Sequence, residues 1–287
     1  MTIKKEKTVY LTNDYAFKRI FGKPGNEKVT KDLLNSILSE KVSNIELDTK
    51  TTLDKDIRGK KAGILDIKAK LNNEVLCDIE LQVTKQEYIE KRILYYWSRL
   101  YISNFKERND YSDLKKTISI LIADFELDIL KKMPQIHTKW EIKESEYGKI
   151  ILTNVFELHI LEIPKLVYQL NEECNKNLLN WLKFIKNPEL VEEDYMKENE
   201  AMAQAKKELE KFNQNEHERY LAEQREIYWH EVNSFKGTGE RQGLKKGIAQ
   251  EKRKIAKKML EENFDIKIIM KMTELTEIDI NSLKNNN

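Results

Sequence analysis

Residues 63–82 read GILDIKAKLNNEVLCDIELQ, and this stretch decides the fold because it has the pattern of two strands joined by a tight turn. Apolar and polar residues alternate over residues 64–71 and again over 75–83, which is typical of strands with one buried face. Residues 72–74, NNE, lie between the two runs, and asparagine tolerates the left-handed backbone of a tight turn. We therefore expect an antiparallel hairpin.

The register of this hairpin decides which side chains share a face. A two-residue turn would pair Asp66 with Ile79 and mix apolar with polar residues on both faces. A three-residue turn pairs Ile67 with Ile79 and places Asp66 opposite Glu80. A shift of two residues would instead place Asp78 opposite Asp66, so the alternation fixes the face and leaves the partner open.

Directly opposite residues of two strands have their Cβ atoms about 5 Å apart. Two carboxylates at that distance repel each other, and a cation between them relieves the repulsion. Mg²⁺ is the natural occupant, because one or two carboxylates and water suffice to bind it. An exposed polar face of a hairpin explains the same alternation equally well.

Five segments together resemble the Rpn family of recombination-promoting nucleases and transposases, within the PD-(D/E)XK nuclease superfamily. The hairpin supplies an Asp and, about a dozen residues later, Glu-X-Gln. The other four segments are LTNDYAFKRIFGKPGNEKVTKDLLNSIL (11–38), ILYYWSRLY (93–101), LHILEIPKL (158–166) and IAKKMLEENFDIKIIMKMTELT (255–276).

The resemblance implies an α/β fold, a restriction-endonuclease-like mixed sheet flanked by helices, with an all-helical C-terminal extension. We expect the nuclease-like domain over residues 8–187, a helical arm with a Gly/Lys-containing linker over 188–248, and a small helical tail over 249–287.

The resemblance also implies the site. Asp66 and Glu80 would hold a metal together with the backbone carbonyl of Leu81, and Asp66, Glu80 and Gln82 would be the catalytic residues. Gln82 stands where other superfamily members carry Lys. Asp14 matches an acidic residue that the family's first helix brings toward the metal. By physics alone, a first-turn acid favoured by the helix dipole is the better explanation of Asp14, and the resemblance makes the two explanations equal.

The activity that follows is hydrolysis of DNA phosphodiester bonds by an endonuclease that uses Mg²⁺, with Mn²⁺ as a substitute. Glutamine carries no charge, so the metal and Lys85 or Arg92 would have to stabilise the negative charge on the phosphate. We therefore expect weak cleavage. One alternative is a weak or inactive nuclease scaffold that binds DNA or a protein. Another is a regulatory module dominated by the tail.

A helix is predicted over residues 85–105, with two tyrosines and two arginines on one face. The arginines would contact phosphates while the tyrosines stack or hydrogen-bond. The simpler alternative is a helix that covers the sheet with its arginines extended to solvent. The predicted nucleic-acid contacts are Lys18, Lys85, Arg92 and Arg99.

Further strands are predicted over residues 117–123, 140–142 and 155–163. The first of them is almost continuously apolar, as in a strand buried on both faces. His137 and His159 have no partners at ligand spacing, so we assign them no role.

Lys and Arg total 51 against 49 Asp and Glu, so contact with nucleic acid must come from local clusters of charge. The first residues have no apolar core of a secretory signal, and no run approaches the roughly 20 apolar residues of a membrane span. We expect a soluble, cytoplasmic protein without contact to a membrane.

The tail contains three predicted helices, over about residues 249–262, 265–272 and 276–284. Short helices with tight turns and a basic patch over residues 252–258 resemble a helix-turn-helix. A bundle that joins copies of the chain into a homo-oligomer is the alternative. Four glycines over residues 237–247 match no phosphate-binding loop, because the GxxxxGK[ST] pattern is missing.

Overall fold

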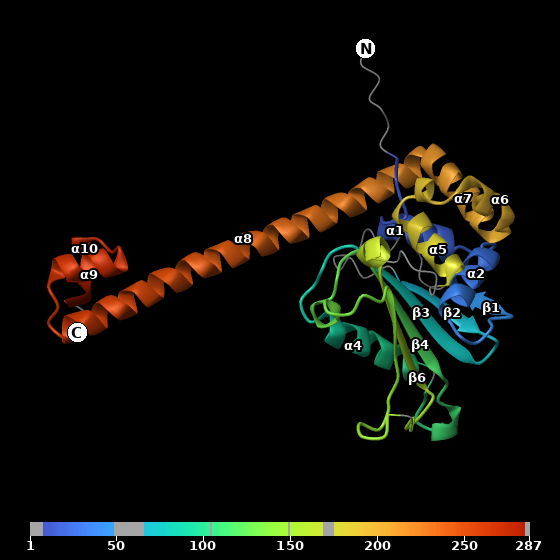
Figure 1. Ribbon diagram of the computed structural model, residues 1–287, viewed down its shortest axis with the longest axis horizontal. Coiled ribbons are helices and arrows are strands. Elements are labelled where there is room, and N and C mark those ends of the chain that lie inside the picture. The colour runs from blue at the N-terminus through green and yellow to red at the C-terminus, as the bar shows by residue number, and fades with distance from the viewer. Residues whose placement is uncertain (1–7, 49–65, 104, 149, 169–174, 285–287) are drawn as a thin grey trace, which may run out of the picture. The chain divides into compact units, whose positions relative to one another are not determined.

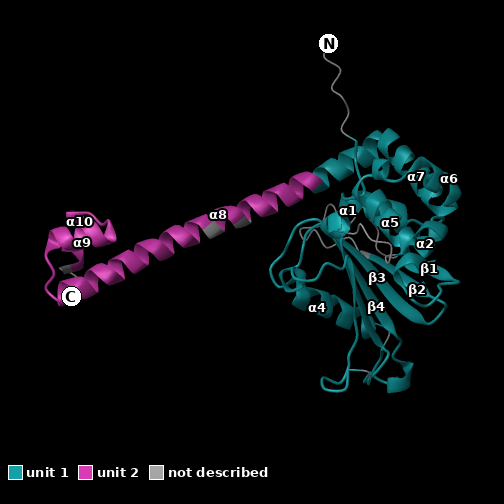
Figure 2. Ribbon diagram, in the orientation of Figure 1, with its two compact units in different colours: residues 1–225 teal, residues 226–287 magenta. Residues whose placement is uncertain are grey.

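The computed structural model describes residues 8–48, 66–103, 105–148, 150–168 and 175–284. The chain divides into two compact units, residues 1–225 and 226–287 (Figure 2). We describe each unit by itself.

The first unit is built on a mixed six-stranded sheet with the order β1-β2-β3-β4-β6-β5 (Figure 1). Neighbouring strands are parallel at β3/β4 and β4/β6 and antiparallel elsewhere. The strands are β1 (Ile45–Leu47), β2 (Asp66–Leu71), β3 (Val75–Gln82), β4 (Thr117–Ala123), β5 (His137–Trp140) and β6 (Phe156–Glu162). The strand predicted over 140–142 lies earlier, as β5, while the prediction for 117–123 is confirmed.

The hairpin β2–β3 has the register of the three-residue turn. Asp66 pairs with Glu80, Ile67 with Ile79, and Asn72 and Asn73 have φ values of 50° and 65°. Two asparagines therefore provide the left-handed turn that fixes the register, which excludes a pairing of Asp66 with Asp78. Residues 64 and 65, which begin the first alternating run, lie outside the described residues.

One face of the sheet carries the larger hydrophobic core. Helices α1 (Asp14–Phe21), α2 (Glu27–Ile37), α5 (Lys176–Lys186) and α7 (Glu200–Gln214) contribute to it. Helix α1 begins after Asn13, whose side chain accepts hydrogen bonds from the backbone N–H groups of Tyr15 and Ala16. Phe17, Phe21 and Trp181 are completely buried in this core.

The other face packs against α4 (Ile89–Tyr101), which is shorter than the predicted helix. Ile89 and Ile93 of α4 contact Leu121 of β4 and Leu158 of β6 in a second cluster. Alternation along β3 places Asp78, Glu80 and Gln82 on this covered face, with only 3–5% of each residue exposed. On β3 the alternative of a solvent-exposed polar face is therefore wrong, whereas on β2 Lys68 is half-buried and Lys70 is exposed. Helix α4 therefore covers a row of polar side chains of β3.

Beyond residue 187 the chain is helical, with α6 (Glu193–Glu198), α7, and α8 (Glu216–Glu261), whose first turns belong to the first unit. The glycine-rich stretch predicted as a linker is continuous helix within α8. Each glycine lowers the stability of a helix by about 1 kcal/mol relative to alanine, but the Lys, Glu, Gln and Leu residues between the glycines favour a helical backbone.

The second unit consists of the remainder of α8, α9 (Ile266–Thr273) and α10 (Glu277–Lys284). Ala256, Ile269 and Ile280 form its small buried core, one residue from each helix. Short 3₁₀ helices complete the chain at Tyr111–Asp113, Asp128–Leu130, Ile163–Tyr168 and Pro188–Leu190. Among the helices of the described ranges, none is both long and apolar enough to span a membrane.

Candidate active site

Glu80 lies at the centre of the site that the sequence predicts. It sits in β3, opposite Asp66 of β2, and is 5% exposed. Its Oε1 accepts hydrogen bonds from Nε2 of Gln82 and, at 3.2 Å, from Nη2 of Arg92 in α4. Directly opposite residues of an antiparallel pair share one face of the sheet, so Asp66 and Glu80 occupy neighbouring positions on the face under α4.

Gln86 closes a ring of hydrogen bonds around this carboxylate. Its Nε2 donates to Oε1 of Gln82 at 3.3 Å, and its own Oε1 accepts from Nη1 of Arg92. Glu80, Gln82, Gln86 and Arg92 are thus joined in a closed circuit that fixes the orientation of each side chain. The sequence analysis missed Gln86, although its position four residues after Gln82 in a polar segment was visible.

Arg92 brings the positive charge that Gln82 lacks. Its guanidinium lies beside the Glu80 carboxylate and also over the ring of Tyr96, 5.4 Å from the ring centroid. Its Nε is buried and finds no acceptor among the residues that the structure describes. Arg92 thus places a cation at the Glu80 carboxylate and keeps one N–H group without an acceptor in the described part of the chain.

Asp14, the predicted ligand from the first helix, is engaged with a residue from the other end of the unit. Arg225 of α8 donates to both of its carboxylate oxygens, with Nη2 2.8 Å from Oδ2. Asp14 and Arg225 are 8% and 5% exposed. The Asp14 carboxylate thus has an ion-pair partner in a helix that the sequence analysis did not connect with it, and its role toward a metal stays a prediction.

The predicted nucleic-acid contacts are not gathered in one place. Lys18 is 6% exposed within α1, and this burial argues against direct contact with nucleic acid. Lys85 is exposed and pairs with Asp128 at 2.7 Å. Arg99 lies on the outer face of α4 with its guanidinium over the ring of Tyr95. Of the four, Arg92 alone contacts the central carboxylate among the described interactions.

A second polar cluster, on the opposite face of the sheet, joins the two histidines to which no role was assigned. His137 and His159 are linked by a 2.7 Å hydrogen bond, and His159 contacts Glu157 at 2.8 Å. Burial and the neighbouring His159 lower the pKa of His137 to about 4. Burial favours a raised pKa for Glu157, but hydrogen bonds from His159 and Lys116 outweigh it and lower the pKa to about 2. Pairing between β5 and β6 creates this cluster, and the spacing of the histidines could not reveal it.

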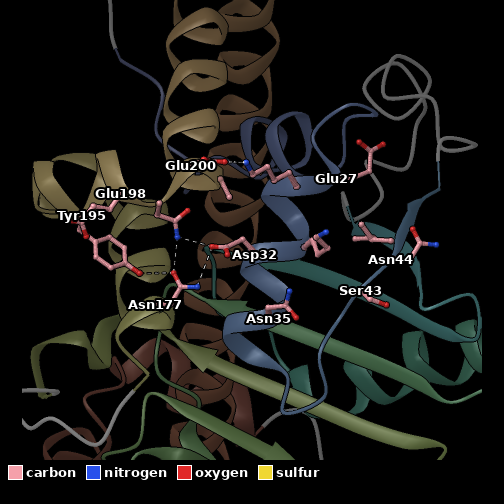
Figure 3. Close-up of a pocket in the computed structure, with 14 residues that line it drawn as sticks. Glu27, Asp32, Asn35, Ser43, Asn44, Asn177, Tyr195, Glu198 and Glu200 are labelled. Carbon is pink, nitrogen blue, oxygen red and sulfur yellow. Dashed lines mark hydrogen bonds and ion pairs between the residues drawn. The ribbon is translucent and has the colours of Figure 1, made fainter.

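A pocket of about 770 Å³ lies elsewhere in the first unit, lined by residues of α2, α5, α6 and α7 (Figure 3). Asp32 is the centre of its polar wall and accepts hydrogen bonds from the side chains of Trp181 at 2.8 Å, Asn199 at 3.0 Å and Asn177 at 3.3 Å. Tyr195 donates to Asn177 in turn. All three donors bond to Oδ2 of Asp32, and we assign no ligand to this pocket.

The donors at Glu80 suit a hard divalent cation. Glu80 of β3, Asp66 opposite it in register and the backbone carbonyl of Leu81 would together offer only oxygen ligands, the kind that Mg²⁺ or Mn²⁺ takes. Within the described ranges, no three His, Cys, Asp or Glu side chains gather as a metal site. The expected set needs no such cluster, because Mg²⁺ is commonly held by one or two carboxylates and water.

Two family models match the chain. The model for PD-(D/E)XK nuclease family transposases covers residues 11–238, and the model for the C-terminal HTH domain of the Rpn/YhgA-like nuclease family covers residues 249–285. No curated protein and no solved structure matches the chain. The six-stranded mixed sheet with helices on both faces is the predicted restriction-endonuclease-like fold, and the C-terminal match points to DNA binding. The chain therefore belongs to the PD-(D/E)XK nuclease family transposases and carries the C-terminal HTH domain of the Rpn/YhgA-like nucleases.

Proposed function

We propose that the protein is a metal-dependent DNA endonuclease whose active site is the face of the β2–β3 hairpin beneath α4. The observation that carries this proposal is the register pairing of Asp66 with Glu80, a buried carboxylate that an arginine and a glutamine hold in place. Asp66, Glu80 and the carbonyl of Leu81 would bind Mg²⁺, or Mn²⁺ in its place. Asp14 is a further candidate ligand.

In the proposed reaction, water adds to the scissile phosphorus and the bond from phosphorus to one sugar oxygen breaks. The products are a phosphate on one strand end and a hydroxyl on the other. When bound, the divalent cation stabilises charge on the phosphoryl group and acidifies the attacking water.

The protein's own residues orient the reactants. Gln82 and Arg92 fix the Glu80 carboxylate, and the amide of Gln82 is the group that would hydrogen-bond the water. Arg92 would stabilise the negative charge that develops on the phosphate. In other superfamily members a Lys at the position of Gln82 has this role. Electrostatic stabilisation of this kind is often the largest contribution to rate.

The alternative function is an inactive scaffold that binds DNA or a protein partner. It is favoured by one observation, since Oε1 of Glu80 already accepts two hydrogen bonds from neighbouring side chains. Under this alternative the HTH domain carries the DNA contact. Homo-oligomerisation through the C-terminal helices stays a prediction.

The test is nicking of supercoiled plasmid by the purified chain with Mg²⁺, with Mn²⁺ and with EDTA. We expect cleavage that requires the metal and that is lost in Asp66→Ala and in Glu80→Gln. Asp78→Asn is the matched control, because Asp78 lies on the same strand and face but bonds to Ser119 at 2.6 Å. Equal cleavage by wild type and Asp66→Ala would contradict the site, and absence of cleavage with both metals would favour the scaffold.

A further inference from the structure

The outer surface of α4 carries an aromatic and basic row that the packing of the domain does not use. We call Tyr88, Lys91, Tyr95, Arg99 and Ile102 the α4 stripe. Within α4 a spacing of four residues places Lys91, Tyr95 and Arg99 on one side of the helix, while Tyr88 and Ile102 flank its two ends and Tyr88 contacts Lys91. Tyr88, Tyr95 and Ile102 are 67%, 56% and 57% exposed, whereas the opposite side of α4 buries Ile89 and Ile93.

Each tyrosine of the α4 stripe carries a cation over its ring. Lys91 Nζ lies 5.1 Å from the ring centroid of Tyr88, and the Arg99 guanidinium lies 5.9 Å from that of Tyr95. Tyr95 also meets the ring of Tyr96 in an edge arrangement with the centroids 5.4 Å apart, but more than half of each stripe tyrosine is exposed, so ring surface remains available for stacking. The α4 stripe therefore combines flat apolar surfaces with positive charge along one line.

The backbone of Tyr88 adds a second, independent observation. Tyr88 has φ 57° and ψ 35°, a left-handed conformation that is rare and unfavourable for a bulky residue. Residues held in such conformations concentrate at ligand-binding and active sites. Tyr88 is also more exposed than Tyr95 and Ile102, the other large hydrophobic residues of the α4 stripe.

The α4 stripe begins beside the proposed active site. Arg92, one residue after Lys91, contacts Glu80, and Gln86, two residues before Tyr88, contacts Gln82. From this point α4 extends for 13 residues. A helix of that length spans about 20 Å, which would accommodate several nucleotides.

We propose that the α4 stripe binds a single-stranded segment of DNA next to the phosphodiester that the enzyme cleaves. This inference rests on the proposed nuclease function and names the substrate class, DNA with an unpaired region. Exposed rings favour this class, because the face of a base is free to stack only when the base is out of the duplex. Duplex DNA would use the cations and leave the tyrosines without a role.

The test measures binding without cleavage, in EDTA, with the full chain and two fluorescent probes. One probe is an oligo(dT) strand and the other is a blunt hairpin duplex. We expect Tyr88→Leu and Tyr95→Leu each to weaken binding of oligo(dT) by about ten-fold and to change duplex binding by less than two-fold. Tyr147→Leu is the matched control, because Tyr147 is 70% exposed in the loop after β5 and lies outside the α4 stripe.

Wild-type affinity of both α4 variants for oligo(dT) would overturn the proposal, and so would an equal loss on both probes. Thermal unfolding of each variant serves as a check that the fold is intact. Because binding is measured without metal, the result does not depend on cleavage. If the wild type cuts no plasmid but Tyr95→Leu weakens its binding of oligo(dT), the proposed nuclease function is contradicted and the single-strand binding site is supported.

Discussion

Arg225 of α8 and Asp14 of α1 form a buried, two-pronged ion pair, with Arg225 Nε 2.9 Å and 3.1 Å from the two carboxylate oxygens and Nη2 2.8 Å from Oδ2. The two residues are 211 positions apart in the sequence. Around them, Tyr15 donates to Glu218 at 2.8 Å and Asn13 to the carbonyl of Ala222 at 3.0 Å. The first turns of α8 are therefore part of the nuclease domain.

We expect Arg225→Met to destabilise the first unit by about 3–5 kcal/mol, because it removes the guanidinium from a buried carboxylate. The double variant Asp14→Leu/Arg225→Met should recover much of this loss, since an apolar pair replaces the charges. Urea unfolding monitored by tryptophan fluorescence measures both. Arg241→Met, at an exposed position of α8, is the control and should leave the unfolding midpoint unchanged. Equal stability of Arg225→Met and wild type would contradict a structural role for the pair.

A fragment that ends at residue 187, the domain boundary expected from the sequence, should fail to fold. Met202, Leu209 and Phe212 of α7 belong to the main core and lie beyond that boundary. A fragment that ends at residue 225 keeps them and the Asp14–Arg225 pair. We expect the longer fragment to give a cooperative unfolding transition and the shorter one to be protease-sensitive or insoluble. A cooperative transition for the shorter fragment would show that α6 to α8 are dispensable.

The histidine pair should make stability depend on pH. His137 has a pKa of about 4 in the folded protein, below the ordinary value of 6.5. The unfolded chain therefore binds a proton first as the pH falls, so the stabilising contribution is complete above pH 6.5 and is lost between pH 6.5 and 4. His137→Gln should reduce the slope of the free energy of unfolding against pH, between pH 6.5 and 4, by at most about 1.4 kcal/mol per pH unit. The free energy of unfolding, measured across this range, should keep its wild-type slope in His217→Gln, because His217 is exposed.

The alternation was sufficient to place Asp66 and Glu80 on the same face of the hairpin, but it left the partner of Asp66 open between Glu80 and Asp78, and the structure settles it as Glu80. The sequence also indicated the helix that covers the site. The ring of Glu80, Gln82, Gln86 and Arg92 could not be derived, since the direction of a side chain from a helix toward a sheet depends on how the two pack. The same holds for Asp14 with Arg225, where nothing local signals a partner so distant in the sequence.

The charge at the active site provides the last prediction. If Arg92 replaces the superfamily lysine, Arg92→Gln should lower plasmid cleavage by about 100-fold, the effect expected for the loss of one electrostatic contact to the transition state. Gln82→Lys in the Arg92→Gln background should recover part of the rate, because the new ammonium stands at the superfamily position next to Glu80. Arg108→Gln, in an exposed loop, is the control for charge alone. The measurement is the single-turnover rate at which supercoiled plasmid is converted to the nicked circle. If Arg92→Gln/Gln82→Lys is as slow as Arg92→Gln, the restored positive charge has no effect on the rate. Arg92 would then act only by orienting Glu80.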